Sequence, residues 1–85
     1  LALGESMTVH VRYFAVLRER AGRERESVEI EPMTARELVD RLIRERGLGL
    51  PSPLIRIAVG GAFVEDGSVL ADGDEIVLLP PVAGG

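Results

Sequence analysis

Hydrophobic and polar residues alternate in three short stretches of the chain, and this period of two is typical of half-buried β-strands. The three stretches are residues 8–14, 27–31 and 75–79. In the first stretch, Val9, Val11 and Tyr13 share one face. In the last stretch, the alternation predicts that Leu78 points into the core and that Leu79 points outward.

The region between residues 54 and 74 also favours strands and turns. Residues 54–59 form a mostly apolar run, which is typical of an interior strand. Gly60-Gly61 is expected to turn the chain into a short strand at residues 62–65. Residues 68–70 are a candidate for one more strand, and a tight turn with Gly73 at positive φ should follow. The acidic residues of that turn lack the ligand spacing of a calcium loop, so no metal site is predicted there.

The main helix is predicted from a capping signal and an apolar stripe. Thr34 and Glu37 have the T-x-x-E spacing of a capping box. Met33 and Leu38 occupy the hydrophobic-staple positions around it, and Gly47 is the expected stop. The apolar stripe consists of Ala35, Leu38, Val39, Leu42 and Ile43. The oppositely charged residues expected to pair four positions apart are Glu37/Arg41, Asp40/Arg44 and Arg41/Glu45.

Two short segments link the first strand to the second. Residues 15–21 contain good helix formers and precede Gly22, so a short helix with a glycine stop is predicted. Residues 23–26 carry four charges in a row and are expected to form a solvated turn. Because only this short connection separates the two strands, they should pair antiparallel.

The order of these elements predicts an α+β fold with one mixed sheet. The first and last strands are expected side by side in the centre, because the last strand must pair somewhere buried. A mixed sheet of about five strands packed on one main helix is the β-grasp, ubiquitin-like arrangement. Residues 7–79 are expected to form this domain, and residues 80–85 a flexible tail. Residues 1–6 are interpreted as an upstream extension or an expression remnant.

Composition narrows the classes of function. The chain has 85 residues, a net charge of −4, one His and no Cys. The acidic balance argues against nucleic-acid binding, which depends on Lys and Arg contacts to phosphates. Without Cys, thiolate catalysis, disulfides and iron–sulfur clusters are excluded, and with one His no metal site is expected. No apolar run is long enough to span a membrane and no signal peptide is recognisable, so a cytoplasmic location is expected.

The last six residues, Pro80-Pro81-Val82-Ala83-Gly84-Gly85, suggest a tail that is presented to other proteins. Pro80 and Pro81 cannot donate ladder hydrogen bonds, so they stop sheet pairing and keep the chain extended. Gly84 and Gly85 lack a Cβ, so a partner can approach their backbone closely. The α-carboxylate of Gly85 is a poor electrophile at neutral pH, because it is ionised. It would need activation, for which adenylation by ATP is the usual route.

Both ends of the chain resemble the small subunit of molybdopterin synthase, a family within the ubiquitin-like sulfur-carrier superfamily. The residues that carry the resemblance are Val11-Arg12-Tyr13-Phe14-Ala15-x-Leu17-Arg18-Glu19 near the start and the run from Asp72 to Gly85 at the end. The resemblance extends over residues 7–85. The family usually has aromatic residues where this chain has Leu78 and Leu79.

The resemblance implies a sulfur carrier in molybdenum-cofactor biosynthesis. An E1-like adenylyltransferase would use Mg-ATP to adenylate Gly85, and sulfur from a persulfide donor would replace AMP to give a thiocarboxylate. The large synthase subunit would then accept the tail, so that its sulfur reaches a cyclic pterin monophosphate precursor. The chain would bind no cofactor itself, and the catalytic groups would lie on the large subunit of a heterotetramer.

The resemblance also implies roles for further residues. Gly84 would keep the approach to the large subunit narrow. The stem that holds the terminal glycines away from the domain would be Pro80, Pro81, Val82 and Ala83. Phe14, Phe63 and Leu79 match family positions that contact the large subunit and the activating enzyme.

Two kinds of alternative stay open on the sequence. The chemistry of Gly85 is shared with sulfur carriers for thiamin or tRNA thiolation and with ubiquitin-like protein modifiers, although the Pro80-Pro81 stem favours the molybdopterin role. The other alternative is a non-catalytic β-grasp interaction module whose Gly-Gly end is incidental.

Overall fold

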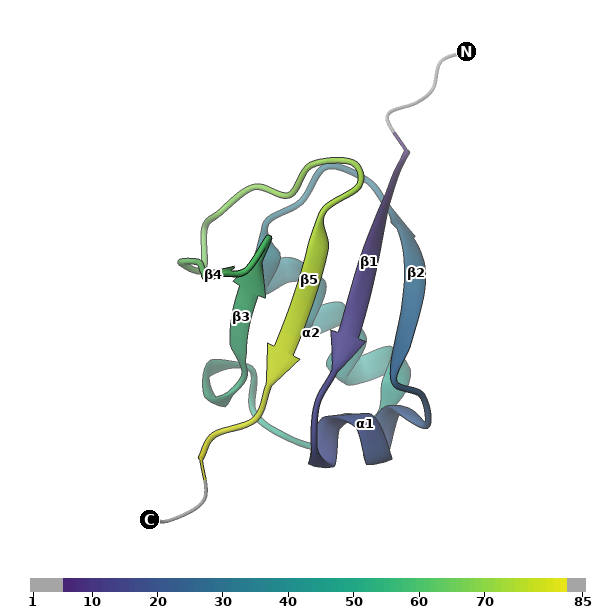
Figure 1. Ribbon diagram of the computed structural model, residues 1–85, viewed down its shortest axis with the longest axis vertical. Helices are drawn as coiled ribbons and strands as arrows, with labels where there is room; N and C mark the ends of the chain where they lie inside the picture. The colour runs from purple at the N-terminus through teal and green to yellow at the C-terminus, as the bar shows by residue number, and fades with distance from the viewer. Residues whose placement is uncertain (1–5, 83–85) are drawn as a thin grey trace.

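A mixed sheet of five strands is the centre of the fold (Figure 1). The structure is a computed structural model that describes residues 6–82. The strands are β1 (Met7–Tyr13), β2 (Arg25–Ile30), β3 (Arg56–Val59), β4 (Ala62–Phe63) and β5 (Glu75–Leu79). Their order is β2-β1-β5-β3-β4; β1 and β5 run parallel, whereas the other neighbouring pairs are antiparallel. The predicted fold class is confirmed, with the first and last strands side by side in the middle.

The parallel pairing of β1 with β5 sets the register of both strands. Val11 lies opposite Ile76, and Tyr13 lies opposite Leu78. These four side chains point to the same side of the sheet and are almost fully buried. Leu79 follows on the opposite side and is half-buried. The alternation predicted for the last strand is therefore confirmed.

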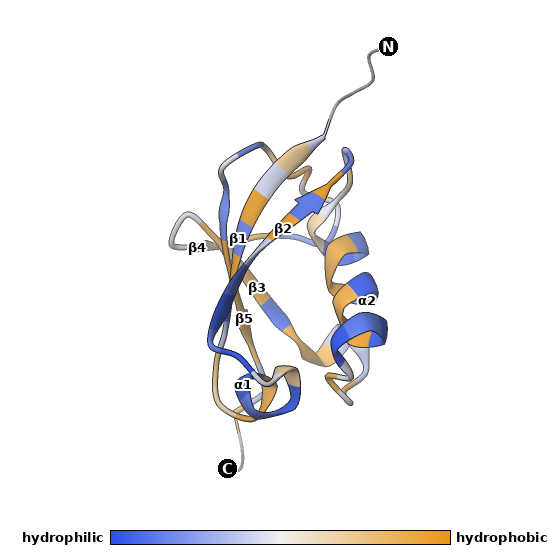
Figure 2. Cartoon of the chain, turned by 90° about the vertical axis from the view of Figure 1, so that its right-hand side faces the viewer, coloured by the Kyte–Doolittle hydropathy of each residue, from blue (hydrophilic) through white to orange (hydrophobic). Residues whose placement is uncertain are grey.

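Helix α2 (Ala35–Arg46) covers the inner face of the sheet and turns its apolar side toward it (Figure 2). The capping box is confirmed: Thr34 Oγ1 accepts from the Glu37 N–H at 3.2 Å, and Glu37 Oε1 accepts from the Thr34 N–H at 2.8 Å. Gly47 ends the helix in the left-handed region at φ 65°. The helix residues buried against the sheet are Ala35, Leu38, Val39 and Leu42.

The charged side of α2 differs in part from its prediction. Arg41 pairs with Glu45, as expected, with Nε and Oε2 3.1 Å apart. The expected pairs Glu37/Arg41 and Asp40/Arg44 are not among the ion pairs within residues 6–82. The carboxylate of Glu37 instead accepts from the helix cap, because that backbone N–H has no partner within the helix.

A short helix, α1 (Val16–Ala21), follows β1 at the end of the sheet where β5 also ends (Figure 1). Leu17 is fully buried, and Gly22 stops the helix at φ 76°, as predicted. Ala15, just before the helix, has φ 54° and ψ −129°. An alanine is rarely found at positive φ, because its Cβ crowds the backbone there.

The connection between α2 and β5 contains less strand than predicted. Leu54 belongs to a 3₁₀ turn, η1 (Ser52–Leu54), and β3 begins only at Arg56. Residues 68–70 form no strand but one isolated bridge, from Val69 to Thr34. The turn with Gly73 at positive φ, 87°, is confirmed.

Arg36 holds this connection against the start of α2. Its Nη1 donates to the carbonyl oxygens of Ser52 and Ile55, and its Nη2 donates to Asp66 Oδ1 at 2.8 Å. The planar guanidinium thus satisfies backbone acceptors from η1 and a carboxylate from the β4–β5 connection at the same time.

The charged segment at residues 23–26 is not the solvated turn that the sequence predicts. β2 already begins at Arg25, and the Glu26 side chain is only 8% exposed. Its carboxylate accepts from Tyr13 Oη at 2.6 Å and from Arg46 Nε and Nη2, each at 2.7 Å. β2 pairs with β1 as far as Arg25, so the alternation of inward and outward side chains extends into the charged run. Glu26 is therefore one of the inward side chains, near the end of α2. The cluster of Tyr13, Glu26 and Arg46 ties β1, β2 and α2 together.

The three groups of this cluster shift each other's protonation. Hydrogen bonds from Arg46 lower the pKa of Glu26 to about 2, although burial acts in the opposite direction. Burial first, and then the hydrogen bond to Glu26, raise the pKa of Tyr13 above its ordinary value. The bond to Glu26 likewise raises the pKa of Arg46. The pair is therefore charged, and the phenol neutral, across the physiological range.

The Glu26 cluster predicts a specific loss of stability in acid. The pKa of Glu26 falls from an ordinary 4.5 to about 2 on folding. The ionised Glu26 therefore stabilises the fold fully at a pH above its ordinary pKa. This stabilisation is lost as the pH falls toward the pKa that Glu26 has in the folded chain. We expect this group to account for a loss of about 2 kcal/mol in unfolding free energy between about pH 6 and pH 3.

Urea unfolding at both pH values measures this loss. Glu26→Gln cannot ionise, so its unfolding free energy should fall by about 2 kcal/mol less than that of the unchanged chain over the same interval. Equal losses in the two chains would contradict the assignment.

Ala15→Gly should raise stability, because glycine adopts φ 54° without a Cβ clash. We expect a gain of about 1 kcal/mol in unfolding free energy, after subtracting the greater chain entropy of unfolded glycine. Ala21→Gly, inside α1, is the matched control and should lose about 0.5–1 kcal/mol. Chemical denaturation measures both, and a loss in both variants would show that the backbone at Ala15 is not strained.

Candidate functional site

Phe14 and Leu79 lie next to each other at the end of the sheet where the chain leaves β5. The parallel pair of Tyr13 and Leu78 comes just before them, and the Phe14 N–H donates to the carbonyl oxygen of Leu78 at 3.3 Å. Both side chains are half-buried. They lie on the side of the sheet opposite α2, which we call the outer face.

β3 and β4 extend this apolar area across the outer face. Val77 pairs with Ala58, and Ala58 pairs with Phe63. Side chains of paired residues point to the same side of a sheet, so Phe63 and Val77 share the outer face. Phe63 is 57% exposed, which is unusual for an aromatic residue of this size. We call Phe14, Phe63, Val77 and Leu79 the tail-side patch.

The chain leaves the sheet beside this patch. Pro80 is half-buried, Pro81 is exposed, and Val82 is 91% exposed. Neither proline can donate a hydrogen bond to β1 or β3, so pairing ends with Leu79. The remaining predicted tail residues, Ala83, Gly84 and Gly85, lie outside the described residues.

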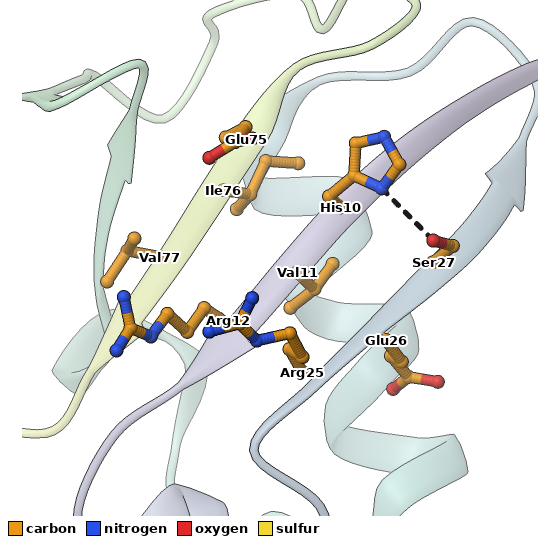
Figure 3. A pocket seen from close by; sticks show the side chains of 9 residues that line it. All are labelled: His10, Val11, Arg12, Arg25, Glu26, Ser27, Glu75, Ile76 and Val77. Carbon is orange, nitrogen blue, oxygen red and sulfur yellow. Dashed lines mark hydrogen bonds between the residues drawn. The ribbon is translucent and has the colours of Figure 1, made fainter.

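The other half of the outer face contains a hollow of about 330 Å³ (Figure 3). The polar residues that line it come from β2, β1 and β5 and are His10, Arg12, Arg25, Glu26, Ser27 and Glu75. Nδ1 of His10 lies 3.0 Å from Oγ of Ser27, and both side chains are exposed. This agrees with the prediction that His10 is a solvated strand residue.

The side chains whose pKa values are shifted lie on the other side of the sheet from this hollow. The groups with clearly shifted pKa values belong to the cluster of Tyr13, Glu26 and Arg46 on the inner side of the sheet. Within residues 6–82, no three His, Asp or Glu side chains gather in a way that could hold a metal ion. No helix in that range has the length and apolarity needed to cross a bilayer.

Nearly the whole length of the chain matches known proteins. A family profile described as the ThiS family matches residues 11–85. The chain belongs to the ThiS family. The molybdopterin synthase sulfur carrier subunit of Drosophila melanogaster is 34% identical, and the match covers 96% of both chains. The subunit of the same name from Drosophila yakuba is 30% identical, again over 96% of both chains. The resemblance to the molybdopterin synthase small subunit is thus confirmed.

Solved structures place this ThiS-family chain among ubiquitin-like proteins. Small archaeal modifier protein 1 from Methanosarcina acetivorans has a TM-score of 0.74 and 27% identity, over 96% of this chain and 100% of the other. Ubiquitin from Caldiarchaeum subterraneum has a TM-score of 0.69 and 21% identity, over 95% of this chain and 100% of the other. At that identity the likeness concerns the fold alone, and it confirms the β-grasp prediction.

The structure brings the predicted contact residues together and adds two that sequence reasoning missed. Phe14, Phe63 and Leu79 lie on one face beside the point where the tail begins. Arg12 and Arg56 lie on that same face, next to the two aromatic rings. The alternation of the first strand places Arg12 on the same side as Phe14, but the position of Arg56 depends on its pairing with Leu79.

Changes in the tail-side patch should affect stability less than changes in the core. Phe63→Ala should cost less than about 1 kcal/mol of unfolding free energy, because most of the ring is already exposed. Leu78→Ala, also in the sheet but fully buried, should cost about 2–5 kcal/mol. Thermal and urea unfolding of both variants measure the difference, and similar losses would show that Phe63 supports the fold rather than a surface.

Proposed function

We propose that this chain is a sulfur carrier that donates sulfur, as the small subunit of molybdopterin synthase, in the formation of the molybdenum cofactor. The observation that carries the proposal is the combination of a full-length match to sulfur carrier subunits with the exit of β5 through Pro80-Pro81 beside an exposed apolar patch. A carrier of this kind needs a stable domain, a projecting end and a surface for its partners. A cytoplasmic location accords with this role.

The proposed chemistry takes place at Gly85, with every catalytic group supplied by other proteins. In an E1-like adenylyltransferase, a carboxylate oxygen of Gly85 attacks the α-phosphorus of Mg-ATP and releases pyrophosphate. The terminal sulfur of a persulfide donor then attacks the carbonyl carbon, and AMP leaves. A second thiol cleaves the resulting acyl disulfide, which leaves a thiocarboxylate on Gly85 and a disulfide on the donor side. No cofactor is bound by the chain itself.

The partners would use the outer face. Phe14, Phe63 and Leu79 would contact the large synthase subunit and the adenylyltransferase in turn, while Pro80 to Ala83 hold Gly84 and Gly85 in the partner's channel. Burying an exposed aromatic side chain gains about 1.5–3 kcal/mol, which association costs then offset in large part. The modest net free energy of binding would allow the chain to exchange between partners. The assembled synthase would be a heterotetramer of two small and two large subunits.

A second function deserves a test because of the archaeal structures. The similarity to small archaeal modifier protein 1 supports a role in protein modification, in which the same activated Gly85 would form an amide with a lysine of a target. Both roles share the adenylation step, so the product on Gly85 discriminates between them. A thiocarboxylate supports the carrier, whereas an amide to another protein supports the modifier.

Incubation with an E1-like adenylyltransferase, Mg-ATP and a persulfide donor should convert Gly85 to a thiocarboxylate. Intact-mass analysis should show the replacement of one oxygen by sulfur. One residue added after Gly85 should prevent this replacement, because the activated carboxylate would no longer follow the Gly-Gly pair. Absence of any mass change in the unextended chain would contradict the proposal.

Gly84→Val tests the narrow approach. A β-branched side chain next to the carboxylate should lower the rate of thiocarboxylate formation or sulfur transfer by at least about tenfold. Its thermal midpoint should match that of the unchanged chain. Ser6→Val, at the other end of the described chain, is the control and should leave the transfer unaffected.

A further inference from the structure

Each aromatic ring of the tail-side patch carries an arginine guanidinium over it. Cζ of Arg12 lies 5.0 Å from the ring centroid of Phe14, and Cζ of Arg56 lies 4.0 Å from that of Phe63. Both distances are within the range of a cation–π contact. The patch is therefore not simply apolar, because any partner that covers the rings also meets two fixed positive charges.

The strand register places the backbones of these two arginines on the two strands that flank β5. Arg12 pairs with Val77 from β1, and Arg56 pairs with Leu79 from β3. β5 lies between those two strands, so their backbones are about 10 Å apart, twice the spacing of neighbouring strands. The Arg12 side chain extends from β1 over β5 and ends beside Val77 (Figure 3). Arg56 starts from β3 and lies over Phe63 on β4.

The two guanidinium groups are poorly compensated within the chain. Arg12 has one carboxylate partner, Glu24, at 3.6 Å, and both side chains are about half exposed, so the pair is weak. Arg56 has no carboxylate within 4.0 Å among residues 6–82. Arg25, which pairs with Arg12 and lies on the same face (Figure 3), adds a third positive charge. Arg12, Arg25 and Arg56 thus bring three positive charges to the outer face, although Glu75 also lies on it and the chain as a whole has a net charge of −4.

We propose that Arg12 and Arg56 are specificity-determining residues, and that the tail-side patch docks on a protein surface that has an apolar area and one carboxylate for each guanidinium. Each guanidinium lies over its own ring, Arg12 over Phe14 and Arg56 over Phe63, so each offers a separate site for a carboxylate. A protein surface can supply two acidic side chains and an apolar area as well. A partner with Lys or Arg at those places would be repelled.

Stacking on the rings makes these arginines effective recognition groups. A guanidinium held over an aromatic face has already lost much of its rotamer freedom, so less entropy is lost when a carboxylate binds. It also keeps its planar edge free for a bidentate hydrogen bond. Charge of this kind mainly raises the association rate and rejects wrong partners.

The inference rests on the proposed function, and the experiment uses the two partners named there. The dissociation constants of the full chain for the large synthase subunit and for the adenylyltransferase of the same organism are measured at about 50 and 300 mM salt. Arg12→Glu and Arg56→Glu should each weaken binding to at least one partner about tenfold or more at low salt, and should reduce the dependence of binding on salt.

Arg44→Glu is the matched control. Arg44 is exposed on α2, on the other side of the sheet, and has no ion pair within residues 6–82. The same change of net charge there should alter binding less than about twofold. Arg56→Lys keeps the charge but loses the planar stack, so its binding should fall between that of the unchanged chain and that of Arg56→Glu. Thermal midpoints confirm that each variant is folded.

The outcomes separate this inference from the function on which it rests. If the unchanged chain takes up sulfur and binds its partners, but Arg12→Glu and Arg56→Glu behave like Arg44→Glu, the inference is wrong and the function stands. If the unchanged chain neither binds the partners nor takes up sulfur, both are wrong. Binding of inorganic phosphate below about 1 mM that disappears in Arg12→Glu would also overturn the inference, because it would indicate a site for a single anion.

Discussion

The parallel pairing of β1 with β5 is the constraint on which the other features of the molecule depend. β5 lies between β1 and β3, so its backbone is bonded on both sides and its position is fixed along its length. The end of β1 and the end of β5 therefore lie together, which brings Phe14 beside Leu79 and the start of the tail. A shift of one residue in this register would turn Ile76 and Leu78 out of the core and bury Leu79 in their place.

Alternate side chains of β5 face the core and the outer surface. Ile76 and Leu78 are packed under α2 and contribute to stability, whereas Val77 and Leu79 face outward beside two aromatic rings. Because side chains on the two faces of a sheet do not touch, the outer surface can change without weakening the core. The proposed exchange between two partners would benefit from this division, since the surface is exposed and apolar while the core remains closed.

Much of this fold could be predicted because its signals are local. The capping box at Thr34, the glycine stop at Gly22 and the alternation in β5 each depend on residues that are neighbours in the sequence. The Glu26 cluster could not be predicted in this way. Four charges in a row look solvated, and only the contacts with Tyr13 on β1 and Arg46 on α2 explain why one of them is buried. The candidate site was also predicted only in part. Phe14, Phe63 and Leu79 were predicted as contact residues from the resemblance, whereas the pairing of Arg56 with Leu79 is known only from the sheet.

An acidic chain can still present positive charges on one part of its surface. The overall charge of −4 acts at long range and is screened by salt within about 10 Å, so it sets solubility more than recognition. In the proposed complex, Arg12 and Arg56 would act at contact distance, where a partner's carboxylates would replace water around them. These local pairs would orient the complex. If the chain is loaded by one protein and unloaded by another, as proposed, oriented binding would be needed, because a purely apolar patch would bind either partner without orienting the tail.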